Sequence, residues 1–252
     1  MLESSTFCVD RRGILKAGAA AAAASALPFA SAFAKSEKPV RIGLLESLTG
    51  TYADVGLSDV QGAKLAVEEI NAKGGILGRP VKLLVEDYGT SPSLGVQKAR
   101  KLIEVEKVDF LAGTSDSAVA LAVSQTALQL KTVFMCTAAH TDAVTGSRCN
   151  WCTFRTCTTT WMLSAGNSRI LFDKFGKGWY FVTPDYAFGH TEQKDYAAQL
   201  KSYGGQVLGN SLFPVGTTDF SSYLVKASLA HPNVLMVLGI GEDKINCLKQ
   251  AT

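Results

Sequence analysis

The chain has 252 residues, 47 % of them apolar, and a formal net charge of +3. This apolar content is enough to bury a core, and the length allows one large domain or two small ones of roughly 100 residues each. The charge is nearly balanced and forms no basic stripe, so the composition gives no support for a nucleic-acid partner.

The N-terminus has the parts of an export signal. Residues 10–16 read DRRGILK, a twin-arginine motif, and an Ala-rich apolar stretch over 17–33 leads to an Ala-x-Ala end at Ala34. This order predicts a twin-arginine signal peptide over 1–34, a mature chain starting at Lys35 and a periplasmic location. An uncleaved membrane anchor is disfavoured, because Pro28 interrupts the run and a spanning helix needs ~20 apolar residues.

From residue 38 onward, short apolar runs alternate with longer amphipathic ones. Strands are predicted at 40–45, 81–85, 108–112, 132–136, 179–183, 206–213 and 234–238. Helices are predicted at 54–73, 93–106, 118–130, 161–175 and 191–203. Two further helices are predicted, one that ends at 229 and one that begins at 242. Residues 115–117 are expected to cap the third helix, and Thr218 or Asp219 the helix ending at 229. Alternating strands and helices favour parallel sheets with helices on both faces.

An irregular stretch at 137–160, rich in Thr, Ser and Cys, interrupts this alternation. We therefore expect two α/β lobes, an N-terminal lobe over 35–157 and a partial C-terminal lobe over 158–252. In open α/β sheets, ligands bind outside the carboxyl ends of the strands. This rule nominates the loops at 46–52, 113–117, 136–141, 184–189 and 239–243. The helix N-termini beside such loops suit a carboxylate or another anionic group.

The sequence contains no strong catalytic motif. It has no G-x-S-x-G elbow, no phosphate-binding G-x-x-x-x-G-K-[ST] loop and no H-E-x-x-H pair. We therefore expect a protein that is not an enzyme and needs no cofactor. Of the three histidines, His140 falls in a predicted ligand loop.

The cysteines suggest a different chemistry. Cys149 and Cys152 form a C-x-x-C pair, which Cys157 or His140 would extend toward a zinc site. A single pair is weak evidence for zinc, and in an oxidising compartment a structural disulfide among the three cysteines is the commoner outcome. Cys136 and Cys247 are expected to be small core residues.

Several segments in the same order resemble a known family. They are LTGTYADVG at 48–56, GAKLAVEEINAKGGILG at 62–78, VEDY at 85–88, FRT at 154–156, PDYAFG at 184–189, GTTDFS at 216–221 and LKQA at 248–251. Together they resemble the periplasmic substrate-binding proteins of branched-chain amino-acid ABC transporters, the leucine/isoleucine/valine-binding class. The resemblance implies a type I periplasmic-binding-protein fold, with two doubly wound parallel-sheet lobes and a ligand cleft between them.

The resemblance also implies a function and a binding site. The protein would be a monomer that captures an amino acid, amide or related small carboxylate and delivers it to the membrane subunits of an ABC permease. The positions matching the family's carboxylate contacts are Ser117 and Ala138, and the next contact falls on His140 or Thr141. Phe188 matches the aromatic residue of the second lobe, and Tyr186 is placed to supply a hydroxyl.

Chains of this family are substantially longer. The second lobe is therefore expected to be incomplete, and the acidic residue that holds the ligand's amino group to lie beyond Thr252. Two alternatives are a ligand-sensing domain on the same clamp fold and a metal or redox protein using Cys149, Cys152 and Cys157. The first would need a membrane-spanning or DNA-binding segment, and the sequence after Ala34 has no apolar run of ~20 residues and no basic helical module.

Overall fold

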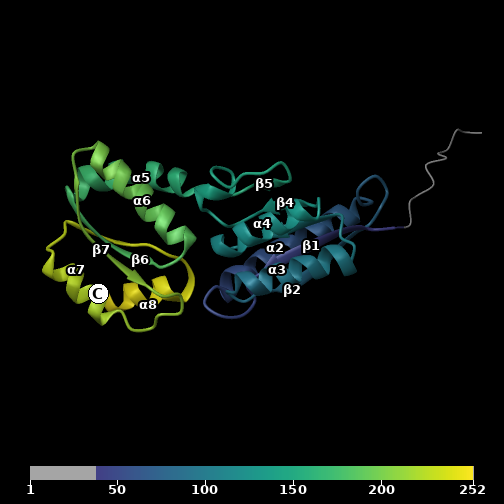
Figure 1. Ribbon diagram of the computed structural model, residues 1–252, viewed down its shortest axis with the longest axis horizontal. Coiled ribbons are helices and arrows are strands. Elements are labelled where there is room, and N and C mark those ends of the chain that lie inside the picture. The colour runs from purple at the N-terminus through teal and green to yellow at the C-terminus, as the bar shows by residue number, and fades with distance from the viewer. Residues whose placement is uncertain (1–37, 252) are drawn as a thin grey trace, which may run out of the picture. The chain divides into compact units, whose positions relative to one another are not determined.

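The computed structural model describes residues 38–251 (Figure 1). The predicted signal segment, with its twin-arginine motif and cleavage position, lies outside the described residues. The predicted α/β class with parallel sheets is confirmed, because every strand pair in the two sheets is parallel.

The first sheet has five strands in the order β2-β1-β3-β4-β5. They are β1 (Val40–Glu46), β2 (Val81–Asp87), β3 (Phe110–Gly113), β4 (Val133–Cys136) and β5 (Thr153–Arg155). The strand order reverses at β1, so the loops after β1 and β3 open on either side of the switch point, where ligands bind in folds of this kind.

Helices cover both faces of this sheet. They are α2 (Ala53–Ala72), α3 (Pro92–Arg100) and α4 (Ser117–Gln129). Leu45, Leu111 and Phe134 are fully buried in one core cluster that includes residues of α3 and α4. The opposite face of the sheet lies against α2, and the two share a cavity of about 430 Å³.

The second sheet has three strands in the order β7-β6-β8. They are β6 (Gly178–Pro184), β7 (Gln206–Phe213) and β8 (Val234–Val237). Successive side chains of a strand point to opposite faces. Trp179 and Phe181 accordingly enter one core cluster, whereas Tyr180 and Val182 enter another. This explains why β6 is an unbroken apolar run rather than an alternating one.

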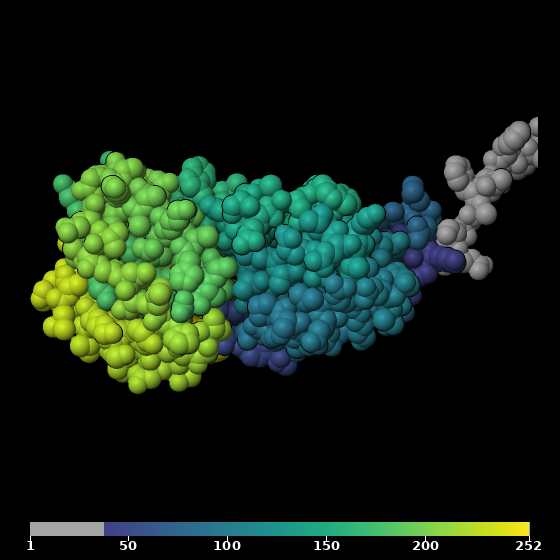
Figure 2. Space-filling view, viewed as in Figure 1, coloured from purple at the N-terminus to yellow at the C-terminus, as the bar shows by residue number. Residues whose placement is uncertain are grey.

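Four helices cover this second sheet: α5 (Thr160–Phe175), α6 (Ala187–Ser202), α7 (Ser221–Leu229) and α8 (Gly241–Ala251). Helices α5 and α6 supply the cluster around Trp179, and α7 and α8 supply the cluster around Tyr180. Figure 2 shows one face of the molecule, with the earlier described residues in purple to teal and the later ones in green to yellow. No helix among residues 38–251 is long and apolar enough to span a bilayer.

Some sequence predictions were wrong in detail. The helix expected over 93–106 is α-helical only to Arg100 and continues as a π-helical turn, η1 (Lys101–Val105). The stretch at 137–160 contains a 3₁₀ turn, η2 (Asp142–Val144), and strand β5. A three-residue edge strand is too short to show a period of two, so the sequence pattern did not reveal it.

Two helix starts also differ. Helix α6 begins at Ala187 rather than at 191. Neither Thr218 nor Asp219 caps α7, because the N-cap is Phe220, whose buried ring packs edge-on against Phe213 with centroids 4.9 Å apart. Asp219 instead accepts hydrogen bonds from the amide and hydroxyl of Ser221, at 2.9 and 2.6 Å.

The division into lobes at residue 157 remains a prediction. Strand β5 ends at Arg155 and α5 begins at Thr160 on either side of that position. Residues from the two predicted lobes also touch, since Glu242 N lies 3.4 Å from Thr51 O.

Candidate functional site

The loop after β3 presents the N-terminus of α4. Gly113 has φ +109°, and a Cβ at this position would lie 2.3 Å from Leu45 O, so the turn requires glycine. The predicted cap is confirmed in Asp116, whose Oδ1 accepts from Ala118 N at 2.7 Å and Val119 N at 3.1 Å. Ser117, the first helical residue, is buried at this N-terminus.

A tyrosine from the neighbouring strand end holds this loop. The fully buried Tyr88 hydroxyl accepts from Ser115 N at 3.0 Å and Asp116 N at 3.2 Å. Burial raises the pKa of Tyr88 above its usual value, so the hydroxyl keeps its proton. Two backbone amides ahead of α4 are therefore fixed from inside the protein, and sequence reasoning did not identify this role of Tyr88.

The loop after β4 carries three of the predicted site residues, Ala138, His140 and Thr141. Thr141 N donates to Ser117 Oγ at 3.3 Å, which joins this loop to the start of α4. A hydroxyl that accepts one hydrogen bond retains its own proton to donate. Ser117 can therefore offer that proton to an anionic ligand group. Ala138 is half-buried in the same loop.

Backbone carbonyls of this loop are held by side chains. Arg155 Nη1 donates to Ala139 O at 2.7 Å, and Nη2 donates to Thr141 O. His140 Nδ1 lies 2.8 Å from Thr158 O. Because a carbonyl only accepts, Nδ1 carries the proton, and in the neutral ring Nε2 remains an acceptor.

The loop after β6 brings the predicted residues of the second sheet to the same place. Thr191, on α6, donates from Oγ1 to Thr141 Oγ1 at 3.1 Å. The Phe188 ring is buried, 6.1 Å from His140 and 6.0 Å from Tyr186 between centroids. The structure thus brings Ser117, His140, Thr141, Tyr186 and Phe188 together through successive contacts. Whether they bind a ligand stays a prediction.

Tyr52 also belongs to this cluster, although it was not among the predicted site residues. Its ring is buried at the end of the loop after β1, 6.0 Å from the ring of Tyr186 between centroids. Burial raises the pKa of both tyrosines above the usual range. The sequence could have identified Tyr52 as a site residue, because it ends the loop 46–52 that the strand-end rule nominates.

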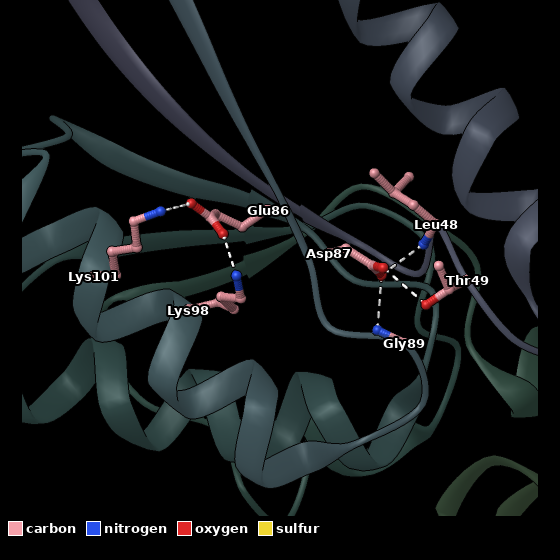
Figure 3. Close-up of polar contacts among 7 residues, drawn as sticks. All are labelled: Leu48, Thr49, Glu86, Asp87, Gly89, Lys98 and Lys101. Carbon is pink, nitrogen blue, oxygen red and sulfur yellow. Dashed lines mark hydrogen bonds and ion pairs between the residues drawn. The ribbon is translucent and has the colours of Figure 1, made fainter.

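Asp87, at the end of β2, fixes the loop that leads to Tyr52 (Figure 3). Its carboxylate accepts from Leu48 N at 2.9 Å, Thr49 Oγ1 at 2.8 Å and Gly89 N at 2.8 Å. Burial alone would raise the pKa of Asp87, but these hydrogen bonds outweigh it and hold the pKa below its usual value.

The neighbouring Glu86 is held by two lysines. It pairs with Lys98 at 2.7 Å and with Lys101 at 2.5 Å (Figure 3). Burial alone would raise the pKa of Glu86, but these partners lower it. The ion pairs link β2 to α3 and η1, away from the loop that leads to Tyr52.

Burial raises the pKa of several carboxyl groups, and Glu46 and Glu192 show this clearly. Glu46, the last residue of β1, is fully buried, and among residues 38–251 its carboxylate has only weak contacts with Thr114 and Ser115, short of a well-formed hydrogen bond. Burial, with a further contribution from Asp59, raises its pKa from 4.5 to about 8. Burial likewise raises the pKa of Glu192, on α6, to about 7. Glu46 is therefore mostly neutral at pH 7, and Glu192 is near the midpoint of its titration.

The disulfide expected among Cys149, Cys152 and Cys157 is not present, because all three are free thiols. Cys149 is exposed, whereas Cys152 is buried and donates from its thiol to Asn150 Oδ1 at 3.1 Å. Residues 38–251 contain no cluster of three His, Cys, Asp or Glu side chains placed to hold a metal ion.

The fold and the strand-end site define a type I periplasmic-binding-protein architecture. The sequence model of the periplasmic binding protein family matches residues 39–252, and the chain belongs to this family. A Leu/Ile/Val-binding protein homologue of Brucella suis is 27 % identical over 230 residues, covering 88 % of this chain and 57 % of its own length.

Solved structures agree in fold. A periplasmic binding protein from Burkholderia mallei superposes with a TM-score of 0.81 at 32 % identity, covering 85 % of this chain and 57 % of its own. An amino acid ABC transporter substrate-binding protein from Pseudomonas fluorescens superposes with a TM-score of 0.75 at 30 % identity, with the same coverage of 85 % and 57 %. This chain therefore spans just over half the length of the proteins it resembles.

Proposed function

We propose that this protein is the solute-binding component of an ABC importer and works in the periplasm. Its solute would be an amino acid, an amide or a related small carboxylate, passed on to the membrane subunits of a permease. This role requires binding and release without chemical conversion. Family membership supports the general role, and the amino-acid transporter relative from Pseudomonas fluorescens supports the solute class.

The observation that carries the proposal is the meeting of strand-end loops from both sheets. Ser117 stands at the positive end of α4, where backbone N–H groups favour a carboxylate. Tyr52, Tyr186 and Phe188 form an aromatic cluster at the strand ends, which suits the apolar part of a small solute. The Thr141–Thr191 hydrogen bond joins the loop after β4 to the first turns of α6, so a ligand that contacts both would favour their approach.

The twin-arginine signal remains part of this proposal, since export is needed to reach the periplasm. A fusion of residues 1–34 to a reporter that folds before export tests whether the segment acts as a twin-arginine signal. We expect periplasmic reporter activity, and loss of that activity when Arg11 and Arg12 are both replaced by Lys. Equal export by the double variant would contradict a twin-arginine route.

A ligand screen on the full chain tests the binding role. Thermal unfolding would be followed with amino acids, their amides and aromatic carboxylates, each at several concentrations. A ligand at 100 times its Kd adds about 2.7 kcal/mol to the free energy of unfolding, which raises Tm measurably. A cooperative melt that no carboxylate or amide shifts would contradict the proposal.

Two serine variants locate the site once a ligand is found. Ser117→Ala removes the proposed donor to the carboxylate and should weaken binding about 10-fold or more, because a hydrogen bond to a charged group contributes roughly 1.5–3 kcal/mol. Ser168→Ala is the matched control, since this buried serine of α5 contacts Tyr203 instead. Equal affinities for the two variants, measured by calorimetry, would remove Ser117 from the site.

A further inference from the structure

Two cysteines far apart in the sequence meet beside the loop that follows β4. Cys136 is the last residue of β4, and Cys157 lies two residues beyond the end of β5. The parallel register pairs Cys136 with Arg155, which brings the following residues of the two strands side by side. Both thiols then donate to the same carbonyl oxygen, Ala139 O, Cys136 at 3.6 Å and Cys157 at 3.4 Å.

Because both thiols lie within hydrogen-bond distance of Ala139 O, their sulfur atoms lie close to each other. The two thiols are also within hydrogen-bond reach of each other. Neither of the other pairings suggested by the sequence has this geometry, since Cys149 is exposed and the thiol of Cys152 donates to Asn150. Cys247 is buried in the core of the other sheet.

The two thiols differ in exposure and in acidity. Cys157 is half-buried, with Arg155 Nη1 4.0 Å from its sulfur, whereas Cys136 is fully buried. When Cys157 ionises, the Cys136 thiol donates its one proton to the Cys157 sulfur instead of to Ala139 O, and this hydrogen bond, together with His140 and Arg155, lowers the pKa of Cys157 below that of an ordinary thiol. The same contact, together with burial, raises the pKa of Cys136. Cys157 is therefore the accessible thiolate, and Cys136 is a protected partner beside it.

We propose that Cys136 and Cys157 form a disulfide when the protein enters an oxidising compartment, and that this bond clamps the loop 137–141. The oxidant is an external disulfide, either a small molecule or a protein. The Cys157 thiolate attacks one of its sulfurs, which breaks the external S–S bond, releases one thiolate and leaves a mixed disulfide. Cys136 then loses its proton to water and attacks Cys157 Sγ, which releases the second thiolate.

The electrons balance in this exchange, because the two cysteines together lose two electrons and the external disulfide gains them. The new bond would tie the end of β4 to the segment that enters α5. The predicted ligand residues Ala138, His140 and Thr141 lie within the loop that it closes. The bond would therefore pre-organise that loop, which lowers the entropy cost of holding a ligand there.

The test uses the full chain without substitutions. The reduced protein is treated with oxidised glutathione, free thiols are alkylated in denaturant, and the peptides are mapped by mass spectrometry. We expect one cross-linked peptide pair, Cys136–Cys157, with the mass lowered by two hydrogen atoms and with Cys149, Cys152 and Cys247 alkylated. A bridge between other cysteines, a stable glutathione adduct on Cys157, or full alkylation of both Cys136 and Cys157 would each overturn the proposal.

A second measurement checks the direction of attack. Alkylation of Cys157 in the reduced native protein should rise with pH through a midpoint clearly below the value of roughly 8.5 for an ordinary thiol. The Cys149→Ser, Cys152→Ser double variant should form the same disulfide at an unchanged rate, and Cys136→Ser should stop at the glutathione adduct. A midpoint above pH 8, or failure of the double variant to cross-link, would contradict the mechanism. Neither measurement needs a solute, so both are independent of the proposed transport role.

Discussion

The buried carboxyl of Glu46 should make stability fall as the pH rises, and Glu46→Gln should remove that dependence. In the folded protein its pKa is raised from 4.5 to about 8, mainly because the buried carboxylate loses its hydration, which weak contacts with Ser115 and Thr114 do not offset. Between these two pH values the folded chain holds a proton on Glu46 that the unfolded chain has released. The free energy of unfolding must therefore decrease as the pH rises through this interval.

The magnitude follows from the same two pKa values. Each pH unit within the interval costs about 1.4 kcal/mol for one proton. The contribution of Glu46 is thus fully favourable below pH 4.5 and is lost progressively up to pH 8, where the total loss approaches about 5 kcal/mol. A glutamine of the same shape cannot ionise, although its buried amide also lacks partners and costs about 1–3 kcal/mol at every pH.

The assay is urea unfolding followed by circular dichroism at pH 5, 6, 7 and 8. We expect the variant to be equal to or less stable than the wild type at pH 5 and more stable by about 2–4 kcal/mol at pH 8. Glu69→Gln, on the exposed face of α2, controls for the loss of one acidic residue from the net charge. The reasoning would be refuted if the free energies of unfolding of the wild type and E46Q differ by the same amount, within about 1 kcal/mol, from pH 5 to pH 8.

Two further predictions concern the loop that leads to Tyr52. Gly56→Ala would place a Cβ 2.0 Å from Ser47 O and should destabilise the protein by about 1–3 kcal/mol or more. Gly62→Ala on the same helix meets nothing within 4 Å and should stabilise by about 0.5–1 kcal/mol, so chemical denaturation should show opposite signs for the two variants. Asp87→Asn should cost about 1–3 kcal/mol at neutral pH, since the carboxylate accepts three hydrogen bonds. The pKa of Asp87 is lowered in the folded state, so its contribution is present above the unfolded pKa and is lost in more acidic solution. The difference in the free energy of unfolding between the wild type and D87N should therefore be smaller at pH 3 than at neutral pH. A larger difference at pH 3 would contradict the role of the carboxylate.

The class of fold could be read from the sequence, because its signals are local. Alternating apolar and amphipathic runs reflect the periods of strands and helices, and these predicted the parallel sheets. The unbroken apolar run of β6 was found for the same reason, since both faces of that strand are buried. The Asp116 cap of α4 was also predictable, because a cap depends on residues only two or three positions apart.

The interior of the candidate site depended on contacts between distant residues. Tyr52 meets Tyr186, and Cys136 meets Cys157, only once the strands are in register and their carboxyl ends lie together. No local period encodes such pairs, and strand β5, which sets the register for Cys157, is too short to leave a pattern. The sequence by itself determined the α/β class and the loops in which a site would lie. Tertiary structure decided which side chains of those loops meet and which carboxyl groups lose their water, because both depend on packing between segments that are distant along the chain.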